Sequence, residues 1–341
     1  MDVRELNETA RALVAEGKGI LAADESTGTI KKRFDSIDVE STEESRRAYR
    51  QMLFTTPGAS DYISGVILYD ETIRQATEDG TPFVELLASE GIVPGIKVDL
   101  GAKQLAFSPE ETVTEGLDGL RERLVEYRGL GARFAKWRAV ITIGEGLPTT
   151  ACIHVNAHAL ARYAALCQDE GLTPIVEPEV LMDGGHTLER CYEVTRATLE
   201  AVYDELYIQG VVLEGTLLKP NMVLSGKDAP EQASTEEVAE ATLRCLRETV
   251  PPAVPGIVFL SGGQSDEAAT AHLNAMNAMG DAPWQLSFSY GRALQAPALK
   301  AWRGRAESVE AGQAAFFRRA RLNGAARTGS YSPEMEELAA A

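Results

Sequence analysis

Short apolar runs recur along the chain, and each is flanked by glycine, proline or polar residues. Runs of this length between turn residues are typical of buried β-strands. Eight of them are found, at residues 20–23, 63–69, 92–98, 134–141, 174–176, 211–218, 257–260 and 286–290. Amphipathic stretches between them predict helices at 41–53, 110–130, 155–170, 188–206, 235–248 and 266–279, several with serine caps at Ser41, Ser108 and Ser265.

Strand and helix therefore alternate along the chain, which favours a parallel sheet covered by helices. Eight β/α units are the number that closes into a (β/α)8 TIM barrel, and an open doubly wound sheet is the alternative. No glycine- or serine-rich linker divides the chain. We expect residues 1–325 to form one barrel domain, with 326–341 as a mobile C-terminal tail.

Composition narrows the set of partners. The 341 residues include 33 Lys and Arg against 51 Asp and Glu, a net charge of −18. Such a charge repels nucleic acid and anionic membrane surfaces. A small anionic substrate requires that lysine and arginine gather in one cleft.

Cysteine usage and the N-terminus both favour a cytoplasmic protein. Cys152, Cys167, Cys191 and Cys245 form no C-x-x-C pair, which indicates reduced thiols. No signal-peptide pattern opens the chain, and no uncharged apolar stretch reaches the roughly 18 residues of a membrane span.

Charged residues stand at or near the ends of five predicted strands. The carboxyl ends of barrel strands form the reaction face, so these charges are candidates for chemistry. They are Asp24, Lys97 with Asp99, Lys136 with Arg138, Glu177 with Glu179, and Lys219. Alternation along a strand places the two residues of each 136/138 and 177/179 pair on one face.

Lys219 is the candidate covalent nucleophile. A lysine in apolar surroundings near a second ammonium has a lowered pKa, which an imine-forming lysine requires. Lys136, two strands away, is the candidate for that second charge. A lone lysine at the end of an apolar strand is usually a solvated strand end, so Lys219 gains its role only together with the other charged residues.

Imine chemistry also needs groups that move protons, and carboxylates at the strand ends supply them. Glu177, Glu179 and Asp24 are the candidates. Each has a simpler interpretation, a surface turn for the two glutamates and a helix cap for Asp24. No Ser-His-Asp or Cys-His set competes with the lysine.

Two segments are candidate anion sites. Ser261-Gly262-Gly263 follows a strand and precedes a helix, so its backbone N–H groups are suited to a phosphate. Arg292, after the last strand, offers a guanidinium to the same anion. A basic turn at 31–33 is a second candidate, although alone it reads as a solvated surface.

A metal site is not expected. His154 and His158 have the spacing of two ligands on one helix face, but the chain lacks the accompanying glutamate and an evident third ligand. A helix surface or a core contact accounts for the pair, and no cofactor is predicted.

From about residue 6 to 331 the sequence resembles the class I fructose-bisphosphate aldolases. The resemblance rests on eight motifs in one order, at residues 19–28 (GILAADESTG), 94–99 (PGIKVD), 116–120 (GLDGL), 134–138 (FAKWR), 174–179 (PIVEPE), 213–222 (LEGTLLKPNM), 259–264 (FLSGGQ) and 288–294 (FSYGRAL).

The resemblance implies a (β/α)8 barrel that cleaves fructose 1,6-bisphosphate reversibly, without metal, to dihydroxyacetone phosphate and glyceraldehyde 3-phosphate. It makes Lys219 the imine-forming lysine, Glu177 the principal acid/base, Glu179 its neighbour, Lys136 the electrostatic partner and Asp24 the group assisting C3–C4 cleavage. It assigns substrate binding to Thr29, Arg33, Lys97, Arg138, Ser261, Gly262, Gly263, Ser289, Gly291 and Arg292. A homotetramer is also implied.

Two positions depart from the family pattern. Animal members end in a tyrosine that reaches the active site, whereas the last tyrosine here is Tyr331. Leu100 stands where those enzymes have a second lysine. A metal-dependent aldolase and a barrel that only binds its ligand remain as alternatives, and the direction of flux and the preference for one or two phosphates stay open.

Overall fold

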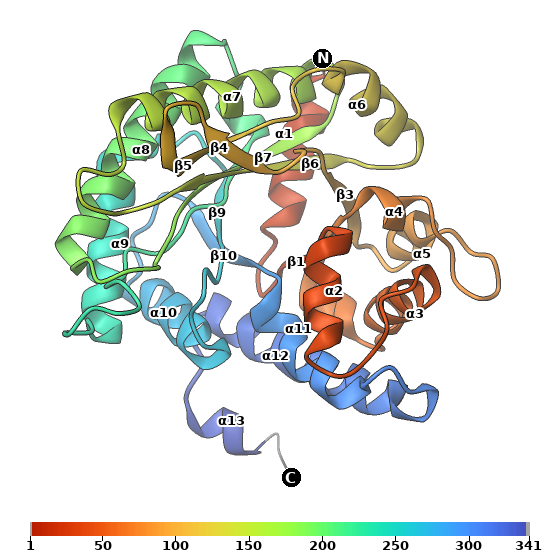
Figure 1. Cartoon of the computed structure of the whole chain (residues 1–341). Coiled ribbons are helices and arrows are strands. Elements are labelled where there is room, and N and C mark those ends of the chain that lie inside the picture. The colour runs from red at the N-terminus through yellow and green to blue at the C-terminus, as the bar shows by residue number, and fades with distance from the viewer. Residues whose placement is uncertain (1, 339–341) are drawn as a thin grey trace.

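The computed structural model describes residues 2–338, and its centre is a closed barrel of parallel strands (Figure 1). The strands around the barrel are β1 (Gly19–Ala23), β10 (Gln285–Tyr290), β9 (Gly256–Phe259), β8 (Leu217–Leu218), β7 (Thr173–Val180), β6 (Phe134–Ile141), β3 (Val93–Lys97) and β2 (Ile63–Leu68). Pairing of β1 with β10, with Ile20 opposite Ser289, closes the sheet. The predicted TIM barrel is confirmed, and the open sheet is excluded.

Helices lie outside the sheet, most of them in a ring around it (Figure 1). They are α1 (Val3–Leu13), α2 (Thr27–Asp35), α3 (Glu43–Phe54), α4 (Asp70–Ile73), α5 (Phe83–Ser89), α6 (Leu120–Gly129), α7 (Thr150–Asp169), α8 (Leu188–Ile208), α9 (Thr235–Thr249), α10 (Asp266–Met279), α11 (Arg292–Trp302), α12 (Val309–Arg327) and α13 (Glu334–Leu338). Side-chain caps fix several starts, since Ser265 accepts from Ala268 N at α10 and Ser234 forms a capping box at α9.

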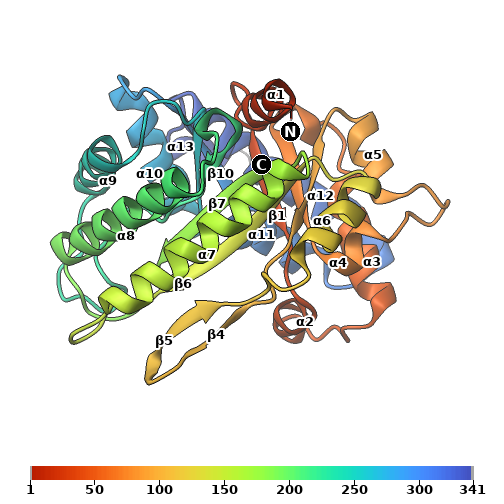
Figure 2. The ribbon, with the colours of Figure 1, turned by 90° about the horizontal axis from the view of Figure 1, so that it is seen from above.

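The predicted helix at 110–130 is wrong over its first half. Residues 102–114 form an antiparallel hairpin of β4 (Ala102–Leu105) and β5 (Ser108–Thr114), so Ser108 is not a helix cap. The β-branched run of residues 112–114 favours extended backbone. Gly116 and Gly119 then adopt positive φ, and α6 begins only at Leu120. Figure 2 shows this hairpin projecting beyond the barrel helices.

Two predicted strands have different lengths in the structure. Only Leu217–Leu218 of the predicted 211–218 strand is β8, because Leu213–Gly215 forms a 3-10 turn. The predicted 174–176 strand is longer, since β7 continues through Glu177 to Val180 and is buried throughout. Reading Glu177 and Glu179 as a surface turn is therefore wrong.

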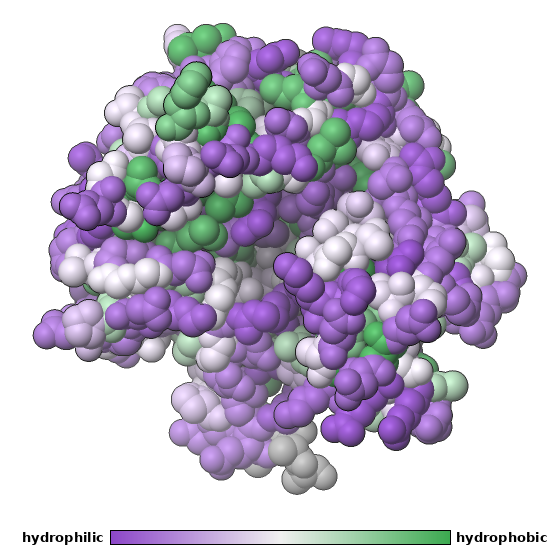
Figure 3. All heavy atoms as spheres, viewed as in Figure 1, coloured by the Kyte–Doolittle hydropathy of each residue, from purple (hydrophilic) through white to green (hydrophobic). Residues whose placement is uncertain are grey.

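Helix α1 closes the amino-terminal end of the barrel. Ala10 and Leu13 of this helix are buried in one cluster with Ile20, Phe134 and Leu217 from the barrel interior. These buried side chains fill the amino-terminal end of the barrel. A ligand can therefore reach the interior only from the carboxyl ends of the strands. Figure 3 shows the surface hollowed near its centre, with hydrophilic residues along much of the rim and a hydrophobic group on the left.

The chain beyond residue 325 packs against the barrel helices. Helix α12 continues to Arg327, Tyr331 is buried with its N–H donating to Asn274 Oδ1 (2.9 Å), and Glu336 Oε1 lies 2.5 Å from Arg319 Nη1. The predicted tail at 326–341 thus includes packed residues up to 336. Its mobility stays a prediction, and residues 339–341 lie outside the described part.

None of the described helices is both long and apolar enough to cross a membrane. The four cysteines are free thiols in the buried interior, which agrees with the predicted reduced state.

Candidate active site

A cavity of about 810 Å³ lies at the carboxyl ends of the barrel strands. Thirteen of the fifteen predicted site residues line it, namely Asp24, Thr29, Arg33, Lys97, Lys136, Arg138, Glu177, Glu179, Lys219, Ser261, Gly262, Ser289 and Gly291. Gly263 and Arg292 are outside its wall. The strand-end pattern therefore located the cavity correctly.

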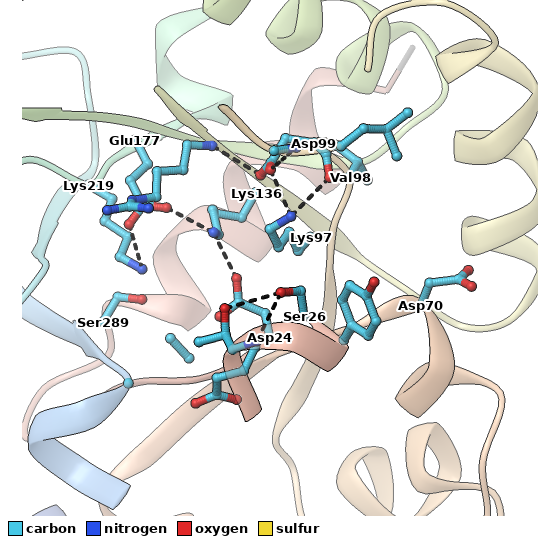
Figure 4. A pocket seen from close by; sticks show the side chains of 18 of the residues that line it. Asp24, Ser26, Asp70, Lys97, Val98, Asp99, Lys136, Glu177, Lys219 and Ser289 are labelled. Atoms are coloured by element: carbon cyan, nitrogen blue, oxygen red, sulfur yellow. Dashed lines mark hydrogen bonds and ion pairs between the residues drawn. The ribbon is translucent and has the colours of Figure 1, made fainter. Parts of the chain in front are cut away.

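Lys219 follows β8 directly, and its N–H donates to Val176 O (2.8 Å), which continues the sheet pairing to this residue. Its side chain is only 4% exposed, and Nζ lies 3.0 Å from Glu177 Oε1. The other oxygen, Glu177 Oε2, lies 3.0 Å from Lys136 Nζ, which in turn is 2.7 Å from Asp24 Oδ2. Figure 4 shows these four side chains converging in the pocket.

Positive and negative groups alternate along this buried row, so each charge lies next to an opposite charge. Burial opposes the charge of Lys136, but Asp24 and Glu177 outweigh it and hold the pKa of Lys136 above its ordinary value. Burial likewise opposes ionisation of Asp24 and Glu177, yet Lys136 and Lys219 keep both carboxyl pKa values below the ordinary range. Glu177 contacts both ammonium groups, an arrangement that the sequence did not indicate. A lowered pKa of Lys219 stays a prediction.

Two further cations of the wall are held by carboxylates. Lys97 Nζ lies 2.7 Å from Asp99 Oδ1 and donates to Asp99 O (2.9 Å). Arg138 Nε pairs with Glu179 Oε2, and burial of the guanidinium is outweighed by that carboxylate, so the pKa of Arg138 is raised. Glu179 thus faces Arg138, on the same wall as Glu177.

The Ser261-Gly262-Gly263 loop joins β9 to α10 with both glycines in the left-handed region, at φ of 44° and 89°. These φ values favour glycine, and a Cβ on Gly262 would also displace Leu260 Cδ1, which it would approach to 2.7 Å. On the neighbouring strand β10, the Ser289 hydroxyl is buried and has no hydrogen-bond partner among the described residues. Figure 4 shows it directed toward the space beside Lys219. A buried hydroxyl without a partner is suited to a ligand oxygen.

Arg292 begins α11 and points away from the cavity. Its Nη1 is 3.8 Å from Asp266 Oδ1, its Nη2 donates to Gln264 O, and its side chain is 44% exposed. Arg292 is therefore next to the glycine loop, outside the cavity wall.

The basic turn lies in α2 and is divided between two environments. Lys31 pairs with Asp35 (2.8 Å) on the exposed surface, as the solvated reading predicts. Arg33 lines the cavity and pairs with Glu25 Oε1. Glu25 is buried, and its second oxygen lies 2.5 Å from Arg50 Nη2.

Sequence reasoning missed Glu25 and the outer part of the cavity. Glu25 directly follows Asp24, and no pattern separates it from an exposed turn residue. The missed outer residues are Tyr69, Asp70, Arg74, Arg123, Glu126 and Tyr127, whereas Leu100, noted in the sequence as a departure from the family pattern, also lines this part. In Figure 4, Asp70 lies across the pocket from Lys219. Most of these residues belong to helices whose pattern looks like an ordinary solvated face.

The two histidines at helical spacing lie on the exposed face of α7, and His158 Nδ1 contacts Glu205 Oε2 at 3.0 Å. Among residues 2–338, no cluster of three or more His, Cys, Asp or Glu side chains has the arrangement of a metal site.

The fold and the cavity define a (β/α)8 barrel enzyme that presents a buried amine to a substrate. A family model described as fructose-bisphosphate aldolase class-I matches residues 5–341. The chain belongs to the class-I fructose-bisphosphate aldolase family. It is an aldehyde-lyase that cleaves fructose 1,6-bisphosphate reversibly through a lysine Schiff base, the mechanism general to this class.

Curated relatives from bacteria and eukaryotes cover nearly the whole chain. The "Probable fructose-bisphosphate aldolase class 1" of Xanthomonas campestris is 62% identical over 332 residues, covering 97% of this chain and 99% of that protein. "Fructose-bisphosphate aldolase 1" of Toxoplasma gondii is 57% identical, with 96% and 91% coverage. A solved Plasmodium falciparum fructose-bisphosphate aldolase, crystallised with TRAP and a small-molecule inhibitor, has a TM-score of 0.96 at 53% identity, covering 97% of this chain and 96% of that one.

His272 of α10 contacts Gln264, the residue that follows the glycine loop, and this contact is sensitive to acid. Its Nδ1 lies 2.7 Å from Gln264 Oε1, and burial lowers its pKa to about 4. In the unfolded chain the imidazole of His272 becomes protonated below about pH 6.5, whereas in the folded protein it stays neutral down to about pH 4. The contribution of His272 to the free energy of unfolding is therefore lost as pH falls from about 6.5 to 4. We expect that loss to reach up to about 3 kcal/mol.

Urea unfolding between pH 7 and 4 measures this effect, with His272→Asn compared with the wild type and with the exposed control His154→Asn. The wild type and the control should lose stability more steeply than His272→Asn. If the free energy of unfolding fell equally with pH in all three proteins, His272 would be protonated as readily in the folded protein as in the unfolded chain, and the expectation would be wrong.

Proposed function

We propose that Lys219 is the residue that forms the imine, by attack of its neutral amine on C2 of the ketose. The observation that supports this assignment best is the position of its amine, which is buried at a strand end, 3.0 Å from a carboxylate that also contacts Lys136. A buried amine next to a proton-transfer group is the arrangement that carbinolamine formation and loss of water require.

Glu177 is proposed as the principal acid/base. It moves one amine proton to the carbinolamine oxygen, and a second proton, taken up by Glu177 from solvent, converts the hydroxyl into the water that leaves, so that a protonated imine forms. Asp24 then accepts the proton of the C4 hydroxyl while the C3–C4 bond breaks, releasing glyceraldehyde 3-phosphate and leaving an enamine on Lys219. Protonation at C3 and hydrolysis of the imine release dihydroxyacetone phosphate. Lys136, between the two carboxylates, keeps them ionised, and Glu179 holds Arg138.

The two phosphates are proposed to bind at opposite sides of the amine. The phosphate on C1 is assigned to the loop of Ser261, Gly262 and Gly263 with Ser289, Gly291 and Arg292. The unpartnered Ser289 hydroxyl and the start of α10 support this assignment. Arg292 must turn toward the loop to take part.

The phosphate on C6 is assigned to Thr29, Arg33 and Lys97, and Arg138 is proposed as a further substrate-binding residue. Each of these cations already pairs with a carboxylate, so the phosphate must compete for them.

We also propose residues 1–325 as one catalytic domain, a homotetrameric assembly and a cytoplasmic location. Two Arabidopsis thaliana relatives, 54% and 57% identical, are named cytosolic, which supports the location.

Trapping of the imine tests the proposal. Borohydride added with dihydroxyacetone phosphate should reduce the imine, add the mass of the reduced adduct to the peptide that contains Lys219, and abolish activity. Borohydride without the ketose is the control and should leave mass and activity unchanged. The proposal fails if the intact mass does not change in the presence of the ketose. Activity measured after EDTA treatment addresses the metal-dependent alternative, and full activity is expected.

A further inference from the structure

We propose that Leu100 is a specificity-determining residue, which limits the advantage of a ketose bisphosphate over a ketose 1-phosphate. The inference deepens the proposed function, because it rests on the second phosphate binding near Lys97. It concerns only the end of the substrate that is remote from the imine.

The wall of the cavity has no excess of positive charge. Its cations are Arg33, Arg74, Lys97, Arg123, Lys136, Arg138 and Lys219. Its anions are Asp24, Glu25, Asp70, Asp99, Glu126, Glu177 and Glu179. The seven positive and seven negative charges of the wall cancel, whereas the whole protein has a net charge of −18. The cluster of lysine and arginine expected for an anionic substrate is present, but its charge is neutralised in place.

Lys97, the cavity-lining cation nearest to Leu100 in sequence, is held firmly by the carboxylate of Asp99. Asp99 is buried, and its Oδ1 forms an ion pair with Lys97 Nζ (2.7 Å) and accepts from Gly101 N (3.1 Å), while Oδ2 accepts from Arg138 N (3.3 Å). These contacts tie Asp99 to backbone on both sides, so it cannot turn away when a phosphate arrives. A phosphate at Lys97 therefore meets an ion pair and gains little attraction.

Leu100 presents an apolar side chain where a further cation would have been effective. It lines the cavity, and it is 62% exposed, which is unusual for a large apolar residue. Its backbone is fixed, because Leu100 N donates to Glu115 O (2.9 Å) and a Cβ on Gly116 would stand 2.9 Å from that same nitrogen. The side chain thus covers part of the mouth with a surface that offers no hydrogen bond to a phosphate but tolerates an uncharged sugar end.

The wild type should therefore favour the ketose bisphosphate over the ketose 1-phosphate only modestly. We expect kcat/KM of the wild type for fructose 1,6-bisphosphate to exceed that for fructose 1-phosphate by less than about 100-fold. A preference above about 1000-fold would overturn the proposal.

Leu100→Lys tests the position, with Leu100→Met as a control of similar size and no charge. An unpaired ammonium about 4 Å from a phosphate in water should lower KM for the bisphosphate about fivefold. KM for fructose 1-phosphate and both kcat values should stay unchanged, and 0.5 M salt should remove the gain. Leu100→Met should match the wild type.

Two outcomes contradict the proposal, namely equal changes for both substrates or no change for either. Borohydride trapping with dihydroxyacetone phosphate, done on the same preparations, separates this failure from failure of the proposed function. Trapping that succeeds while the ratio of the two KM values stays fixed rejects only the role of Leu100, whereas absence of trapping rejects the assignment of Lys219.

Discussion

Replacing Lys219 with arginine should reduce kcat by at least about 10⁴-fold, because a guanidinium keeps the positive charge but does not form an imine. The charge preserves the contact with Glu177, which lies 3.0 Å from the native amine. The fold should therefore survive, and the loss should be chemical. Steady-state cleavage of fructose 1,6-bisphosphate measures the effect, and borohydride with dihydroxyacetone phosphate should no longer label the protein.

Lys227 offers a matched control, since it is an exposed lysine eight positions further along the same segment. Lys227→Arg should retain wild-type activity and labelling. The assignment of the nucleophile would be wrong if Lys219→Arg kept a kcat within about tenfold of the wild type while its unfolding curve was unchanged.

Replacing Lys136 with methionine should destabilise the protein by about 3–5 kcal/mol at pH 7, because it leaves two buried carboxylates next to each other without their shared cation. Asp24 and Glu177 lie 2.7 Å and 3.0 Å from Lys136 Nζ. Lys219 remains near Glu177 and compensates only in part. Activity should fall as well, since both carboxylates are proposed to transfer protons.

The dependence of this effect on pH follows from the direction of the pKa shifts. In the wild type both carboxyl pKa values are lowered, so the ion pairs stabilise the fold at neutral pH and lose this contribution as pH falls below about 4. In the variant without Lys136, burial raises the pKa values of Asp24 and Glu177. Protonation of these carboxylates as pH falls therefore removes their repulsion and reduces the destabilisation of the variant.

The stability gap between the two proteins should therefore narrow from pH 7 toward pH 4. Urea denaturation at several pH values measures it. Asp24→Asn combined with Lys136→Met should recover part of the stability at pH 7. A gap that stays constant with pH would show that Lys136 acts through packing rather than through charge.

The barrel and the centre of its site were predictable because both depend on local pattern. Each strand supplies a short apolar run, and the charged residues that end the runs must meet at one edge once the sheet is parallel. Lys136, Glu177 and Lys219 were found in this way, and their side chains do meet.

The contacts between those side chains were not predictable, since they depend on the order of neighbours around the closed sheet. Glu177 forms ion pairs with both Lys136 and Lys219, and Glu25 forms one with Arg33. These contacts exist because tertiary packing brings the side chains together. The hairpin at 102–114 was missed for another reason. Its glutamates and threonines fit a helical pattern, and only the β-branched run and the following glycines favour strand.

The pairing of β1 with β10 makes the active site a late product of folding. Ile20 and Ser289 are register partners, and the Ser287 hydroxyl donates to Lys18 O across 269 positions of sequence. Loop-closure entropy makes such distant contacts slow to form. Asp24 follows the first strand of the barrel and Ser289 lies on the last, so a ribosome-bound chain that stops short of β10 holds the nucleophile without the full pocket. Appearance of activity during refolding should therefore coincide with closure of the barrel and not with formation of its helices.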